Sequence, residues 1–177
     1  QACGGQLIGH PLAPTTAITG LAIDSRRIKS GDLFAALPGA RADGHDFASV
    51  AMDQGAAALL VQRQVEIDCP QIVVDDCQRA LADVARLARQ PYAGVMLGVT
   101  GSAGKTTTKN LLHAVLSKAG RTLATEGNLN NELGVPLTLS RLDAATEFAV
   151  IEMGAGKPGD IAVLQQMVKP DISVLLT

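Results

Sequence analysis

The sequence of 177 residues is poor in aromatic side chains, with one Tyr, three Phe and no Trp. Proteins that bind single-stranded nucleic acid stack the bases on aromatic side chains, so this composition excludes that kind of platform. The formal net charge is −2, and the basic residues are scattered along the chain. Since no excess of positive charge is available for a phosphate backbone, we expect no nucleic-acid partner.

Long apolar runs are missing as well. No run of 18 apolar residues occurs, which argues against membrane insertion, and the first ten residues lack the regions of a signal peptide. The three cysteines, Cys3, Cys69 and Cys77, have no spacing typical of a metal site or a disulfide framework. These features predict a protein of the cytoplasm with reduced thiols.

Hydrophobic residues make up 47% of the chain, and they fall into short strands that alternate with helices. The first half predicts strands at 18–23, 33–37, 58–61 and 72–74, and helices at 47–54 and from 75 or 76 to 89. The second half predicts strands at 95–99, 122–124, 148–152 and 172–176, and helices at 105–119, 132–141 and 159–168. This alternation is typical of parallel sheets with right-handed crossovers.

Polar residues and prolines mark the helix ends. Asp46 is predicted to cap the first helix, Asp75 or Asp76 to cap the second, and Pro91 to stop it. The helix from residue 105 is predicted to face the sheet with Leu111, Leu112, Val115 and Leu116. We therefore predict an α/β fold in which a small mixed α/β N-terminal domain, 1–91, precedes the first part of a P-loop NTPase-like parallel-sheet domain, 92–177.

A glycine-rich loop joins the strand predicted at 95–99 to the helix predicted from 105. Phosphate oxygens need several backbone N–H groups that converge on one point, and only glycine-rich backbone curls that tightly. Lys105 would bridge the β- and γ-phosphates of ATP, and Thr106 would place its hydroxyl on Mg²⁺. The alternative is a glycine turn with an exposed lysine, and Val99 stands where the full motif has glycine. The predicted phosphate-binding residues are Gly101, Ser102, Ala103, Gly104, Lys105, Thr106 and Thr107.

Glu152 ends the buried strand predicted at 148–152. Because ligands gather at the carboxyl ends of strands in open parallel sheets, Glu152 and the glycine-rich loop can face one site. A charge at that place must be satisfied, so Glu152 is predicted to bind Mg²⁺ or a water on it. Lys105 and Glu152 are the predicted catalytic residues, and Thr106 and Glu152 the predicted metal ligands. The alternative is that Glu152 caps the next helix.

Other polar residues also follow predicted strands. Ser25 and Arg26 suit a uracil edge or a diphosphate, or else form a helix cap and a solvated arginine. Asn130 and Asn131 could bind sugar hydroxyls or a peptide carboxylate, or else form a turn. His45 lies in a turn, where a single histidine is more often structural.

Several stretches together resemble one family. Residues 100–106 resemble the shortened phosphate loop of the Mur ligases, the ATP-dependent amide-forming enzymes of peptidoglycan synthesis. Residues 24–26, 30–37 and 43–47 resemble that family's uridine-nucleotide-binding N-terminal domain. Residues 127–136, Gly-Asn-Leu-Asn-Asn-Glu-Leu-Gly-Val-Pro, and 151–155 resemble the type that adds D-alanyl-D-alanine. The resemblance covers essentially the whole chain.

This resemblance implies a function. ATP would phosphorylate the terminal carboxylate of UDP-N-acetylmuramoyl-tripeptide, and the amine of D-Ala-D-Ala would attack the acyl phosphate. It implies a monomer in the bacterial cytoplasm that uses ATP and Mg²⁺, with no membrane insertion. Because the chain stops within the family's central domain, we expect a fragment that is inactive alone. The substrate-binding residues implied are Ser25, Arg26, Asp43, His45, Asn130 and Asn131.

Other functions stay open at this point. A Mur ligase of the type that adds a single amino acid would share the phosphate loop, but it usually has a threonine-rich segment at the position of residues 127–136. A nucleotide-binding module without catalysis would share the loop as well. A P-loop kinase is a further possibility, although the sequence has no visible lid or arginine-rich segment.

Overall fold

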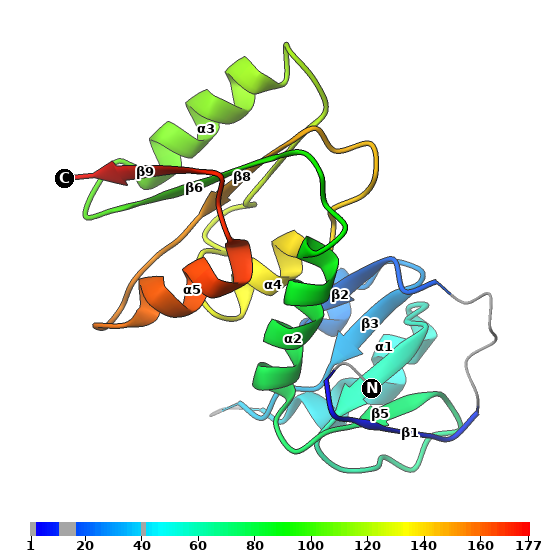
Figure 1. The fold of residues 1–177 in the computed structure, drawn as a ribbon. Coiled ribbons are helices and arrows are strands. Elements are labelled where there is room, and N and C mark those ends of the chain that lie inside the picture. The colour runs from blue at the N-terminus through cyan, green and yellow to red at the C-terminus, as the bar shows by residue number, and fades with distance from the viewer. Residues whose placement is uncertain (1–2, 11–16, 40–41) are drawn as a thin grey trace. The chain divides into compact units, whose positions relative to one another are not determined.

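The computed structural model of this chain describes residues 3–10, 17–39 and 42–177. The backbone contacts divide the chain into two compact units, Gln1–Val84 and Ala85–Thr177, each built on its own sheet (Figure 1). The prediction of an α/β fold with largely parallel strands is confirmed. Among the described residues, no helix is both long enough and apolar enough to cross a membrane.

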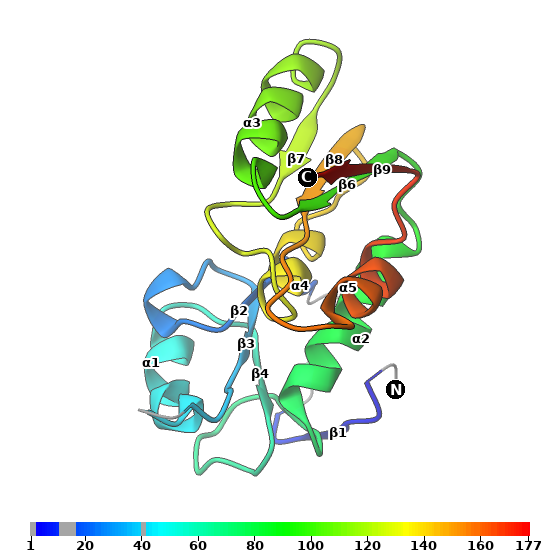
Figure 2. The same cartoon turned by 90° about the vertical axis from the view of Figure 1, so that its left-hand side faces the viewer.

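The sheet of the first unit has the strand order β1-β5-β4-β3-β2. Figure 2 labels β1, β2, β3 and β4 of this sheet. Four strands run parallel: β2 (Gly20–Ala22), β3 (Asp32–Ala35), β4 (Ala58–Val61) and β5 (Gln71–Val73). Their carboxyl ends therefore lie along the same side of the sheet, which we call its carboxyl edge. The edge strand β1 (Gln6–Ile8) pairs antiparallel with β5. The sequence did not predict β1, because three half-exposed residues beside glycines become a strand only through a partner more than sixty residues away.

Two 3-10 turns and one helix follow β2 and β3. The turns are η1 (Ser25–Arg27) and η2 (Gly44–Phe47), and the helix is α1 (Ala48–Asp53). The prediction that Asp46 caps this region is wrong, because Asp43 accepts the His45 N–H at 3.0 Å and Asp46 lies inside the turn. The carboxylate of Asp43 fits because its backbone is extended, as an N-terminal cap requires.

The helix α2 (Cys77–Arg89) begins as predicted from an aspartate. The carboxylate of Asp76 accepts the N–H groups of Gln78 and Arg79 at 2.8 and 3.1 Å. The division between the two units falls within this helix. A domain boundary at residue 91 therefore stays a prediction.

The second unit contains a sheet of four parallel strands in the order β7-β8-β6-β9. Its strands are β6 (Val95–Gly101), β7 (Thr122–Ala124), β8 (Phe148–Glu152) and β9 (Ile172–Leu176). The helix α3 lies on one face of the sheet, and α4 and α5 lie on the other (Figure 1). Their bounds are α3 (Lys105–Leu116), α4 (Gly134–Leu139) and α5 (Asp160–Val168).

The core-facing surface of α3 is narrower than predicted. Leu112 and Leu116 pack against the buried cluster that includes Val99. Leu111 and Val115 were also predicted to face the sheet, and this is wrong, since they are 63% and 67% exposed. Each lies one residue before a packed leucine, about 100° around the helix, so only one of the two rows can meet the sheet.

The helix around Pro136 is shorter than the predicted 132–141. It starts at Gly134, which places Pro136 in its first turn. Proline is tolerated there because the N–H it lacks has no partner within the helix. Asn131 accepts the Gly134 N–H at 2.9 Å, so the polar loop before the helix forms its cap.

The buried side chain of Gln71 is predicted to stabilise the fold of the first unit. Its side chain is 1% exposed, and its amide bonds Val65 N–H, Val65 O and Ile67 O at 2.9 to 3.0 Å. Replacing it with an apolar residue leaves the Val65 N–H without this partner and removes one of the two bonds that each of the two carbonyls accepts. Gln71→Leu should lower the free energy of unfolding by about 2 kcal/mol, measured by urea unfolding of the chain. The exposed Gln78→Leu is the control, and an equal loss in both variants would contradict the prediction.

Candidate active site

The glycine-rich loop connects the end of β6 to the start of α3. Gly101 and Gly104 have φ angles of 144° and 76°, which other residues rarely adopt. A Cβ atom on Gly101 would overlap the carbonyl oxygen of Leu176 on the neighbouring strand β9. Gly104 precedes α3, so the N-terminus of that helix and its dipole face the loop. The loop thus has the form of an anion site at a helix start.

The side chains of the loop point to two different partners. The ammonium of Lys105 donates to the carbonyl of Gly101 at 2.7 Å. The hydroxyl of Thr106 donates to the carboxylate of Glu152, with distances of 3.0 and 3.2 Å to its two oxygens. Val99, where the full motif has glycine, is buried in β6 and pairs with Glu152 in β8. Val99 therefore belongs to the strand, and the loop is formed by the shorter motif of residues 100–106.

Glu152 is a buried carboxylate at the end of β8, with 1% of its surface exposed. Besides Thr106, the side-chain amide of Asn130 donates to it at 2.8 Å. The fold thus brings together Thr106, Asn130 and Glu152, three residues singled out from the sequence. Glu152 does not cap the following helix: the residue before α5 is Gly159, which makes no side-chain cap bond.

A loop that follows β7 folds across the end of β8. Thr125 accepts the backbone N–H of Glu152 on its hydroxyl at 2.9 Å, and the Asn130 carbonyl accepts the N–H of Gly154 at 2.7 Å. Asn131, in contrast, uses its side-chain oxygen to cap α4. Thr125 was not predicted from the sequence, although a polar residue directly after a strand at the same edge is the signal that points to it.

The oxygens of Thr106 and Glu152 suit a hard cation such as Mg²⁺. The described residues contain no group of three or more His, Cys, Asp and Glu side chains arranged to hold a metal. At this place the described residues offer one hydroxyl and one carboxylate, those of Thr106 and Glu152. Such a site fits Mg²⁺ that is bound together with nucleotide phosphates and water, since this ion usually keeps few protein ligands.

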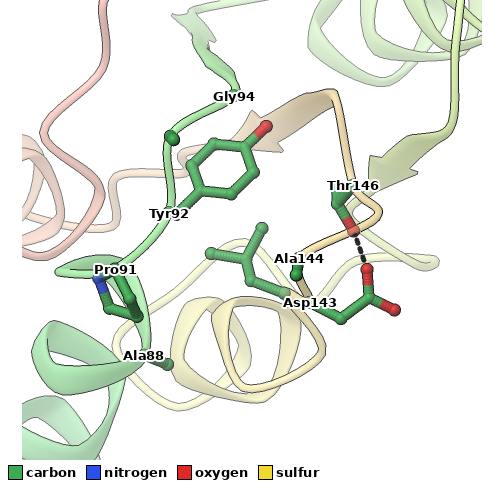
Figure 3. A pocket seen from close by; sticks show the side chains of 9 residues that line it. Ala88, Pro91, Tyr92, Gly94, Asp143, Ala144 and Thr146 are labelled. Carbon is green, nitrogen blue, oxygen red and sulfur yellow. Dashed lines mark hydrogen bonds between the residues drawn. The ribbon is translucent and has the colours of Figure 1, made fainter.

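A cavity of about 370 Å³ lies at the opposite edge of the second sheet, beside the starts of β6 and β8 (Figure 3). Its lining is mostly apolar, and its polar groups bond within the protein. The hydroxyl of Tyr92 donates to Val95 O at 3.3 Å, and Asp143 accepts the hydroxyl of Thr146 at 2.8 Å. Burial raises the pKa of Tyr92 to about 12. This cavity is therefore a weaker candidate than the glycine-rich loop.

The predicted residues of the first unit follow β2 and β3, so they lie at the carboxyl edge of its parallel strands. Ser25 is buried at 7% exposure. Arg26 is exposed and forms two bonds to Asp24, at 2.9 and 2.7 Å. This pairing lowers the pKa of Asp24 below its usual value. The arginine fork is thus held at the surface beside the edge where ligands of such sheets bind.

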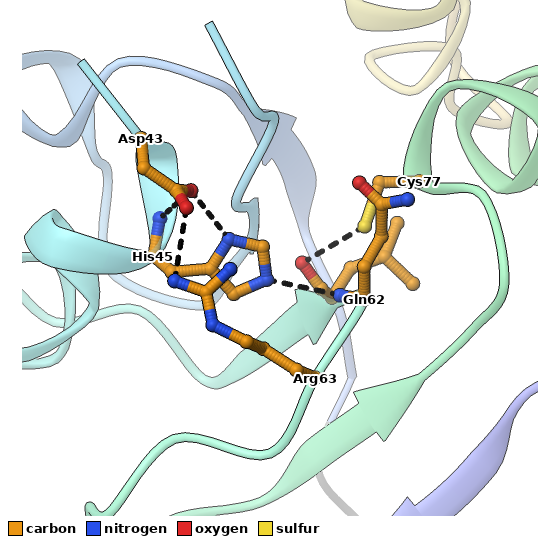
Figure 4. Close-up of polar contacts among 6 residues, drawn as sticks. Asp43, His45, Gln62, Arg63 and Cys77 are labelled. Carbon is orange, nitrogen blue, oxygen red and sulfur yellow. Dashed lines mark hydrogen bonds and ion pairs between the residues drawn. The ribbon is translucent and has the colours of Figure 1, made fainter.

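Asp43 is the centre of a polar cluster at the same edge (Figure 4). It bonds Nδ1 of the buried His45 at 2.6 Å and accepts from Arg63 at 2.9 Å. The other ring nitrogen of His45 accepts the N–H of Gln62 at 3.0 Å, so Nδ1 carries the proton toward Asp43. Both ring nitrogens are therefore engaged within the protein. Gln62 and Arg63, which directly follow β4, were not predicted from the sequence.

The Asp43 cluster predicts a pH dependence of stability. Bonds from the His45 backbone and side chain and from Arg63 hold the pKa of Asp43 well below its ordinary value of 3.8. A carboxyl with a lowered folded-state pKa contributes stability above the ordinary value and loses it as the pH falls toward the folded-state pKa. Asp43→Asn should therefore flatten the dependence of the unfolding free energy on pH below about pH 4. Acid titrations at fixed urea would measure it, and an unchanged slope would contradict the role of the cluster.

Comparisons with known proteins agree with this geometry. Residues 17–93 match the model of the Mur ligase family, catalytic domain, and residues 99–177 match that of the Mur ligase middle domain. The chain is 45% identical over 152 residues to UDP-N-acetylmuramoyl-tripeptide--D-alanyl-D-alanine ligase of Escherichia coli (strain K12), covering 86% of this chain and 34% of the relative.

Solved structures give the same result. MurF from Acinetobacter baumannii matches with a TM-score of 0.83 and 39% identity, over 92% of this chain and 36% of that chain. MurF ligase from Thermotoga maritima in complex with ADP matches with a TM-score of 0.78 and 37% identity, over 92% and 38%. This chain thus spans about a third of the length of these relatives. With both units matched and the phosphate loop in place, the chain belongs to the Mur ligase family.

Proposed function

We propose that this chain is the substrate- and ATP-binding part of a MurF-type ligase, which joins D-alanyl-D-alanine to UDP-N-acetylmuramoyl-tripeptide. The observation that carries this proposal is the buried carboxylate of Glu152, held by Thr106 and Asn130 beside a phosphate loop. A loop alone would suit any P-loop protein. The name of the Escherichia coli relative and the ADP bound to the Thermotoga maritima relative support the choice of substrates.

The proposed reaction has two steps. The terminal carboxylate of the tripeptide attacks the γ-phosphorus of ATP, so the bond to the β-phosphate oxygen breaks and ADP leaves. The amine of D-alanyl-D-alanine then attacks the acyl phosphate, loses a proton and releases phosphate. Phosphoryl transfer depends mainly on positioning and charge neutralisation, so the protein needs no nucleophile of its own.

The residues of the second unit have distinct roles in this scheme. The backbone of the loop 101–107 holds the phosphates, and Lys105 moves from the Gly101 carbonyl to the β- and γ-phosphates. Thr106 and Glu152 would hold Mg²⁺, which when bound neutralises phosphate charge. Asn130 and Asn131 contact the peptide end of the substrate.

The first unit binds the uridine nucleotide in this proposal. Ser25 and Arg26 contact the uracil or the diphosphate, since an arginine fork suits phosphate oxygens. Asp43 and His45 shape the same edge through the bonds to Gln62 and Arg63. Because relatives are about three times longer, we propose that this chain forms no amide by itself. The ligase that contains it would act as a monomer in the cytoplasm.

The catalytic assignment predicts strong effects of two substitutions in the ligase that carries this chain. Lys105→Met and Glu152→Gln should each lower kcat about a hundredfold or more, because both remove charge at the transferring phosphate. The measurement is ADP release that depends on D-alanyl-D-alanine.

The exposed Lys118→Met, just beyond the end of α3, is the control and should leave kcat unchanged. Stimulation of the wild-type protein by a single amino acid instead of the dipeptide would point to the other ligase type. Nucleotide binding without any turnover would point to a non-catalytic module.

The uridine assignment predicts weaker substrate binding. Ser25→Ala and Arg26→Ala should each raise the Kd for UDP-N-acetylmuramoyl-tripeptide about tenfold, since each removes a polar contact to the nucleotide. Isothermal titration of the 177-residue chain measures this. The exposed Arg79→Ala on α2 is the matched control. If the affinity of both variants equals that of the wild type, the uridine site lies elsewhere.

A further inference from the structure

Lys109 is a buried lysine that the reaction proposed above does not use. It lies on α3, one turn beyond Lys105, and is 4% exposed. Removing an ammonium from water is costly unless the charge is compensated by bonds in the protein. A buried lysine at this position therefore indicates a specific interaction of its ammonium, because an apolar residue would fill the same space without the cost of desolvation.

The contact of Lys109 shows where it acts. Its ammonium donates at 2.8 Å to the backbone carbonyl of Thr125, which directly follows β7. A bond from a charged donor is stronger than a neutral one, and low polarity around it strengthens it further. Lys109 therefore fixes the first residue of the loop that crosses the end of β8.

Thr125 is in turn hydrogen-bonded to β8, the strand that ends in Glu152. Its N–H donates to Val150 O at 3.1 Å, and its hydroxyl accepts the N–H of Glu152 at 2.9 Å. Further along the same loop, Asn130 bonds both the Glu152 carboxylate and the N–H of Gly154. A Cβ atom on Gly154 would lie 2.8 Å from the Asn130 side chain, so this approach is close. Glu152 thus bonds this loop at two points, with its backbone N–H to Thr125 and with its carboxylate to Asn130, and Lys109 anchors the loop at Thr125.

We propose that Lys109 is a positioning residue for the nucleotide site. By anchoring Thr125 it holds Glu152 and Asn130 in the geometry in which the carboxylate meets Thr106. This inference rests on the proposed function for its consequence in catalysis. Its structural part, the anchoring of the loop by Lys109, concerns the chain itself and is tested separately.

Hydrogen exchange of the ligand-free chain tests the anchoring. Lys109→Met keeps an unbranched apolar stem and removes the ammonium. The N–H groups of Glu152 and Gly154 should exchange about tenfold faster or more, since their acceptors lie in the released loop, while those of β6 keep their rates. The exposed Lys118→Met is the matched control, and Lys109→Arg, which keeps a charged donor, should restore slow exchange.

Unchanged exchange of both N–H groups in Lys109→Met would overturn the proposal, and so would an equal acceleration throughout β6. If Lys109→Met does not fold, Lys109→Gln takes its place, because it also removes the ammonium that bonds the Thr125 carbonyl but keeps a polar side chain. It should produce the same local acceleration at Glu152 and Gly154. Slow exchange of both N–H groups there would overturn the proposal too.

The catalytic consequence is tested in the ligase that carries this chain. Lys109→Met should raise the half-saturating Mg²⁺ concentration about tenfold and lower kcat, while the exposed control Lys118→Met changes neither. An unchanged Mg²⁺ dependence would overturn the positioning role. A wild-type protein that forms no amide would defeat the proposed function instead, and the exchange experiment would still decide the role of Lys109.

Discussion

The buried carboxylate of Glu152 is the constraint on which the second unit depends. A carboxylate with 1% of its surface exposed is stable only if donors surround it, and the structure supplies Thr106 from one element and Asn130 from another. The parallel register that pairs Val99 with Glu152 sets the carboxylate beside the phosphate loop. Glu152, at the end of β8, therefore contacts three other elements: β6, the start of α3 and the loop after β7.

Backbone geometry limits the same site as strongly as charge does. Gly101 approaches Leu176 so closely that a side chain has no room, and Gly154 approaches Asn130 in a similar way. Since Gly101 ends β6 and Leu176 ends β9, a side chain at Gly101 would separate the ends of two neighbouring strands. The site can therefore combine a curled loop for phosphates with a fixed carboxylate, which is the arrangement that phosphoryl transfer needs.

The first unit also has a carboxylate that is held by protein donors at the ends of parallel strands. Its polar cluster also lies where parallel strands end, and Asp43 is held there by His45 and Arg63. His45 Nδ1 and Arg63 donate to this carboxylate, and the other ring nitrogen of His45 accepts the N–H of Gln62. Arg26, more exposed and paired with Asp24, keeps further donors at the same edge. Each unit thus has polar residues at the carboxyl edge of its own sheet. We propose that those of the first unit bind the uridine nucleotide and those of the second bind ATP.

The features that depend on neighbouring residues could be predicted from the amino-acid sequence. The phosphate loop, the alternation of strands and helices and the cap at Asp76 follow from local backbone and capping rules. Three other features could be known only from the folded chain: which row of α3 faces the sheet, the pairing of β1 with β5, and the bond from Lys109 to Thr125. These features depend on contacts between segments far apart in the chain, and such contacts form only when the sheets have assembled.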